Sequence, residues 1–213
     1  MRRQLLPALI FSLFLFLLNS CAQTRSVKTP VYEDRRTNVV LRGWVDKEDV
    51  PVSHEYAHPA DFQLDDLKYL LHSVNYQEKR LFGWSEVTRV FTADEIYRMT
   101  PHLQAAFAQA GPDKEILFEL KSAKPGLLLP FERISNGTMF VKDGKLNLVF
   151  ANVDAREESD LYTGDPRNYY AGALWTLVVD DWQALVEDER GLHHNWIELD
   201  IALVVGFQLI EVA

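Results

Sequence analysis

The sequence predicts a single α+β domain over residues 39–213, with a mainly antiparallel sheet and two to four short helices. Segments with helical spacing of apolar residues are grouped in the first half, and short β-branched or aromatic segments separated by turn signals dominate the second half. Hydrophobic residues make up 47% of the chain, which is enough for one core without disulfides. No internal repeat divides the sequence, so we expect one domain.

The first half contains most of the expected helices. Residues 39–45 are β-branched and aromatic and predict a first strand. Leucines at helical spacing then predict a helix over residues 63–73. Thr92 and Glu95 fit a capping box at a second helix start. Because Pro101 restarts the apolar pattern, this second region is either two helices or one kinked helix.

The second half is expected to be sheet. Asp143-Gly144, between two apolar segments, is a strong hairpin turn signal. One segment differs: residues 180–189 place Trp182, Leu185 and Val186 on one helical face, which predicts a third helix. The expected strands cover residues 74–82, 116–120, 138–142, 145–150, 174–179 and the apolar run from Trp196 onward.

The beginning of the chain has the pattern of an export signal. Arg2 and Arg3 precede an apolar run over residues 5–18, which is short for a membrane span, and Leu18-Asn19-Ser20-Cys21 ends it. These four residues resemble the lipobox of bacterial lipoprotein precursors. The resemblance implies that residues 1–20 are a cleaved signal peptide and that Cys21 is lipidated and anchors the protein to the membrane. An ordinary signal peptide with a free cysteine and an uncleaved signal anchor are the alternatives.

The resemblance also implies a location. Ala22 stands where an aspartate would retain a lipoprotein in the inner membrane, so we expect the outer membrane, facing the periplasm. Residues 21–38 are polar and charged and lack apolar periodicity, which predicts a flexible tether. The chain has 31 acidic and 22 basic residues and a formal charge of −9, which disfavours binding to nucleic acid and to anionic lipid headgroups.

The segment His54-Glu55-Tyr56-Ala57-His58 matches the HExxH pattern of zinc peptidases. In those enzymes both histidines project from one helix and bind the metal, and the glutamate activates water. Here Pro51 and Pro59 oppose a helix, and no third ligand is evident. A zinc hydrolase that uses His54, His58 and Glu55 is therefore an alternative, and the other interpretation is a loop in which His54 is solvated.

Other clusters give weaker signals. His193-His194 could join a transition-metal site, but adjacent side chains of a strand face opposite ways, and a surface loop is the other interpretation. The acidic run over residues 154–165 lacks the spacing of a calcium loop. No nucleophile elbow or phosphate-binding loop is present, and no cofactor is indicated.

Three functions remain open from the sequence. The first is a lipid-anchored, non-enzymatic module that binds or assembles with another envelope protein in the periplasm. The second is the zinc hydrolase. The third is a carrier of small apolar ligands, which requires a deep cavity lined by the strands of the second half.

Overall fold

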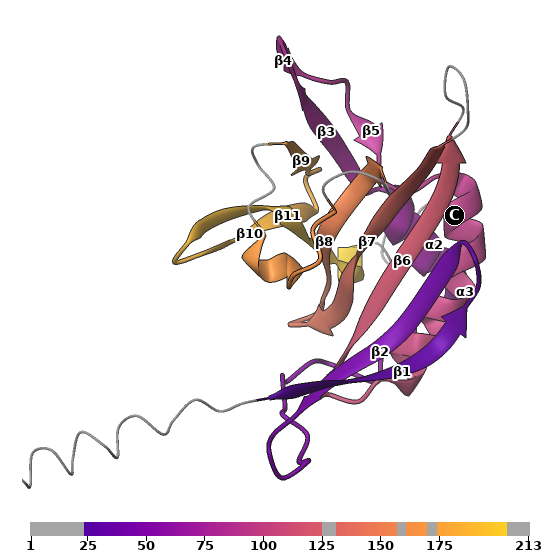
Figure 1. Ribbon diagram of the computed structural model, residues 1–213, viewed down its shortest axis with the longest axis vertical. Coiled ribbons are helices and arrows are strands. Elements are labelled where there is room, and N and C mark those ends of the chain that lie inside the picture. The colour runs from indigo at the N-terminus through magenta and orange to yellow at the C-terminus, as the bar shows by residue number, and fades with distance from the viewer. Residues whose placement is uncertain (1–23, 125–130, 157–160, 170–173, 204–213) are drawn as a thin grey trace, which may run out of the picture.

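The computed structural model describes residues 24–124, 131–156, 161–169 and 174–203. Within these ranges, seven strands form one antiparallel sheet in the order β1-β2-β6-β7-β8-β11-β10 (Figure 1). Their bounds are β1 (Arg25–Glu33), β2 (Thr37–Val45), β6 (Lys114–Lys124), β7 (Phe131–Lys142), β8 (Lys145–Arg156), β10 (Gln183–Asp188) and β11 (Gly191–Asp200).

A smaller group of strands lies beside this sheet. Its centre is β3 (Asn75–Arg80), which pairs with β4 (Gly83–Trp84), β5 (Thr88–Arg89) and β9 (Trp175–Val178). The hairpin formed by β3 and β4 projects from the body at the top of Figure 1.

Two α-helices cover one face of the large sheet. They are α2 (Leu64–His72) and α3 (Ala93–Gln109), and a short 3₁₀ helix, η1 (Pro166–Asn168), lies nearer β8 and β11. The core fills the space between the helices and the sheet; among its fully buried side chains are Leu67, Leu70, Met99, Leu103, Phe107, Ile116, Leu120 and Phe150. We call this covered side the inner face of the sheet.

Most expected elements are confirmed. The leucine pattern forms α2, and Thr92 and Glu95 make both bonds of the capping box at the start of α3. Pro101 lies inside α3, so the region is one helix. Asp143 and Gly144 join β7 and β8 with φ angles of 51° and 73°, as the hairpin turn requires. Strand outweighs helix in the described residues, and the domain is therefore mostly β rather than a balanced α+β mixture.

The tether expected over residues 21–38 is wrong for most of its length. Arg25–Glu33 is the edge strand β1, and the pairing with β2 begins opposite Val45. An edge strand is held by backbone hydrogen bonds on one side and needs no buried face, so its polar sequence gave no strand signal. Tyr32 adds a side-chain contact, because its ring stacks on His102 of α3 with the centroids 3.5 Å apart.

The helix expected over residues 180–189 is also wrong. Gln183–Asp188 is the strand β10, which pairs with β11 and contains a bulge between Leu185 and Glu187. The extra residue of a bulge shifts the strand alternation and can imitate helical spacing. Trp182 instead stacks on Tyr69 of α2.

The predicted signal peptide and Cys21 lie outside the described residues. In the part of the chain that the structure describes, no helix is long and apolar enough to cross a membrane.

Candidate functional site

The face of the large sheet opposite the helices carries a polar groove, and we call this side the outer face. Because successive strand residues point to opposite faces, the residues between the buried core positions of β2, β6 and β7 face outward. The strand register aligns these outward residues in three rows that run across the sheet.

The first row is charged. Lys28 of β1 lies opposite Arg42 of β2, and Arg42 lies opposite Glu115 of β6. The Lys28 side chain makes no ion pair or hydrogen bond with other described residues. Two cations are thus adjacent on an otherwise acidic protein.

The second row forms an apolar floor. Val40 lies opposite Leu117, and Leu117 lies opposite Thr138 of β7. Val40 and Leu117 are only half-buried, so the groove leaves apolar surface available for a ligand.

The third row is polar and ends the groove. Asn38 lies opposite Glu119, and Glu119 lies opposite Asn136. The Glu119 carboxylate has no ion-pair partner within the described ranges. The groove is therefore positive at the Lys28 and Arg42 end and negative at the Glu119 end.

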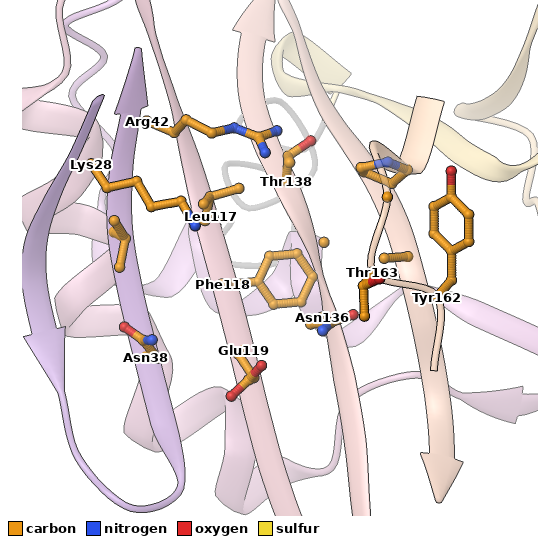
Figure 2. A pocket seen from close by; sticks show the side chains of 15 residues that line it. Lys28, Asn38, Arg42, Leu117, Phe118, Glu119, Asn136, Thr138, Tyr162 and Thr163 are labelled. Atoms are coloured by element: carbon orange, nitrogen blue, oxygen red, sulfur yellow. The ribbon is translucent and has the colours of Figure 1, made fainter. Parts of the chain in front are cut away.

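These rows line a cavity of about 290 Å³ (Figure 2). Its walls are β1 on one side and residues 162–166 on the other. Figure 2 shows the Arg42 guanidinium beside Thr138 and the Lys28 side chain reaching toward Leu117, with Glu119 farther along the strand. Ligand pockets occupy roughly 300–1,000 Å³, so this one suits a small ligand or a short segment.

Side-chain hydrogen bonds fix the wall formed by residues 162–166. Asn152 of β8 bonds to both backbone polar groups of Tyr162: its Nδ2 donates to the Tyr162 carbonyl at 2.9 Å, and the Tyr162 N–H donates to its Oδ1 at 3.0 Å. At the other end, Asn195 Nδ2 donates to the Pro166 carbonyl at 2.8 Å. The wall is thus attached to β8 and β11, and the groove is largely formed without a ligand.

A buried ion cluster supports the positive end. The Glu115 side chain is fully buried and accepts hydrogen bonds from Arg42, whose Nε lies 2.6 Å from Oε1, and from Arg167 at Oε2. Arg167 also donates to the Tyr56 hydroxyl at 3.2 Å. Burial is the main cause that raises the pKa of Tyr56, and the Glu115 charge raises it further, so this hydroxyl stays neutral. One carboxylate between two guanidiniums fixes Arg42 at the groove and leaves an excess positive charge there.

Two polar atoms of the groove are unsatisfied. Thr138 is 1% exposed, and its Oγ1 and the buried Asn38 Oδ1 have no hydrogen-bond partner in the described structure. Buried polar groups are normally paired, and protein atoms enclose both of these acceptors, so a ligand or a water would bond to either one only after a local shift. Both residues line the cavity.

The HExxH segment does not form a metal-binding helix. Residues 54–58 are a loop, and Glu55 is exposed with a φ of 57°. His58 is buried with both ring nitrogens occupied: Nδ1 lies 2.8 Å from the Lys114 carbonyl, and Nε2 accepts from the Val141 N–H at 3.0 Å. His58 therefore acts as a connector between backbone segments, and burial lowers its pKa.

His54, interpreted from the sequence as a solvated loop residue, does lie in a loop but is half-buried. Its ring packs between Trp44 and Tyr56, with centroids at 4.6 and 5.4 Å, and its buried Nε2 has no partner in the described ranges. Burial lowers the pKa of His54, which keeps this ring neutral beside the arginines.

The two adjacent histidines also differ from the surface-loop interpretation. His193 and His194 lie on β11 and not in a surface loop, and they have different neighbours: Asp188 lies 2.9 Å from His193, and Thr176 lies 2.9 Å from His194. Over the described residues, no three His, Cys, Asp or Glu side chains are grouped so that they could hold a metal ion.

Comparison with protein-family models, curated proteins and solved structures gave no match. The groove and its chemistry are thus the basis for a functional assignment. The residues of the groove were not identified from the sequence. One signal was present in Asn136-Gly137-Thr138, because a glycine inside a strand indicates that another backbone approaches closely. A Cβ on Gly137 would lie 2.2 Å from the Val149 carbonyl oxygen, so β7 and β8 approach closely beneath the groove.

Proposed function

We propose that the protein is a lipid-anchored, non-enzymatic binding module of the bacterial envelope, and that the outer-face groove is its binding site. The observation that carries this proposal is the charge polarity of the groove around an apolar floor. Lys28 and Arg42 lie at one end, Val40 and Leu117 in the middle, and Glu119 at the other end.

This pattern fits a short, extended peptide segment. Arg42 and Lys28 are suited to a carboxylate, and Glu119 to a cationic group. The two ends are separated by the four-residue interval from Glu115 to Glu119, or about 13 Å along the strand at roughly 3.3 Å per residue. We infer that the ligand is the carboxy-terminal segment of another envelope protein, with an apolar side chain on the groove floor and a basic residue about three positions before the carboxylate.

The other two functions have less support. A zinc hydrolase would need a free His58 ring nitrogen, and both are bonded to backbone groups. A carrier of apolar ligands would need a cavity among the core side chains, whereas the cavity described here lies on the outer face and includes Lys28, Arg42 and Glu119.

Site-specific photo-crosslinking in the native host tests the binding site. A photoreactive amino acid in place of Val40, on the groove floor, should capture a discrete partner, and the same amino acid in place of the exposed Val50 should not. Equal labelling at both positions, or none at Val40, would contradict the proposal.

The anchor is tested separately. Labelled fatty acid should enter the wild-type protein, and Cys21→Ser should lose both the label and the membrane fractionation. A Cys21→Ser variant that keeps its fractionation would refute the anchor without affecting the groove.

A further inference from the structure

The tip of the β3–β4 hairpin exposes two large apolar side chains. Leu81 and Phe82 form the turn between the two strands, and 93% and 97% of their surfaces are exposed. These are the highest exposures among the exposed large hydrophobic residues that the structure describes. The hairpin carries them away from the body of the molecule (Figure 1).

Basic and aromatic groups lie directly behind this tip. The Lys79 Nζ is 4.9 Å from the centre of the Trp84 ring, and Trp84 is 43% exposed. Arg80 is next to Leu81 and pairs with Glu78 at 2.8 Å. The hairpin thus ends in an apolar pair and continues with an indole and two cationic side chains.

We propose that this tip inserts Leu81 and Phe82 into the interfacial region of a lipid bilayer. Trp84 and Lys79 then lie at the level of the headgroups, where an amphipathic ring and a long cationic side chain are favoured. This inference goes beyond the groove and does not depend on lipidation of Cys21.

The size and shape of the tip favour a bilayer over a protein partner. A stable protein interface engages about 20–30 residues on each side, and a convex tip of two apolar side chains is far smaller. A bilayer requires no complementary surface, and a few apolar groups can enter its interfacial region. The acidic chain opposes anionic membranes, so insertion depends on the apolar pair, and a zwitterionic bilayer suffices.

An environment-sensitive fluorophore tests the insertion. The full chain carrying Cys21→Ser and Phe82→Cys has one thiol, which is labelled with nitrobenzoxadiazole and mixed with phosphatidylcholine vesicles. We expect the emission to increase and to shift to shorter wavelength. The matched control carries the fluorophore at Glu189→Cys, an exposed position in the turn between β10 and β11, and its emission should not change.

A second variant separates insertion from simple proximity. Leu81→Asp combined with the fluorophore at position 82 should lose the shift, because a carboxylate opposes entry of the tip. The proposal is overturned if positions 82 and 189 respond alike, or if Leu81→Asp keeps the shift. It is also overturned, in favour of a protein partner, if the shift occurs only with native envelope membranes and disappears when these are treated with protease.

Discussion

The two faces of the large sheet use alternate residues of the same strands, and they differ in what those residues contact. On the inner face, Leu120 and Ile116 of β6 are buried against other apolar side chains. On the outer face, Leu117 is half-buried, and its neighbours in the groove include charged and unsatisfied polar groups. The inner face therefore provides folding stability, and the outer face retains surface that a ligand can cover.

The largest loss of stability is expected at Glu115, the buried carboxylate that connects the outer face to the groove wall formed by residues 162–166. Glu115→Gln removes the counter-charge of Arg42 and leaves Arg167 with Asp165 at 3.4 Å, so it should lower the free energy of unfolding by about 3–5 kcal/mol. Glu198→Gln, which removes the partly exposed pair with Lys145, should cost less than about 1 kcal/mol. Urea denaturation measures the free energy of unfolding of both variants. If Glu115→Gln loses no more stability than Glu198→Gln, the Glu115 cluster does not stabilise the fold.

The next largest loss of stability is expected at a core leucine, and a groove leucine on the same strand is its control. Leu120→Ala opens a cavity in the core and should cost about 2–5 kcal/mol, whereas Leu117→Ala should cost less than about 1 kcal/mol. Leu117→Ala should in turn weaken peptide binding, and Leu120→Ala should not if the fold is retained. Equal destabilisation would remove the distinction between the two faces.

Acid should weaken the fold through the buried His58 and the half-buried His54. Burial lowers the pKa of His58 and His54, so below about pH 6.5 the unfolded chain binds protons that the folded protein does not. The free energy of unfolding should then fall with decreasing pH, by up to about 1.4 kcal/mol per pH unit for each histidine. His58→Gln should reduce this slope between pH 6.5 and 5.5, and an unchanged slope would show that His58 titrates normally when folded.

Sequence patterns predicted the elements that bury apolar faces. The leucines of α2, the capping box of α3 and the Asp143-Gly144 turn are local signals, and each formed the expected element. The edge strand β1 was missed because its stability comes from backbone pairing with β2, and β10 was misassigned because of its bulge.

The groove could not be predicted because its residues meet only through the strand register. Lys28, Arg42 and Glu115 are far apart in the sequence and form one row across three strands. The HExxH pattern was prominent in the sequence, but its histidines connect backbone and aromatic groups in the folded chain.

The most direct measurement compares two charge reversals in a peptide-binding assay. The probes are six-residue peptides with a free carboxyl end and a lysine three positions before it, together with the same peptides amidated at that end. Lys28→Glu should reduce the affinity for the free-carboxylate peptides by about tenfold or more. A tenfold loss of affinity corresponds to about 1.4 kcal/mol of binding free energy. Lys47→Glu, an equal charge change on an exposed loop, should leave the affinity unchanged. If both variants bind like the wild type, or if amidated peptides bind equally well, the groove is not a carboxylate-binding site.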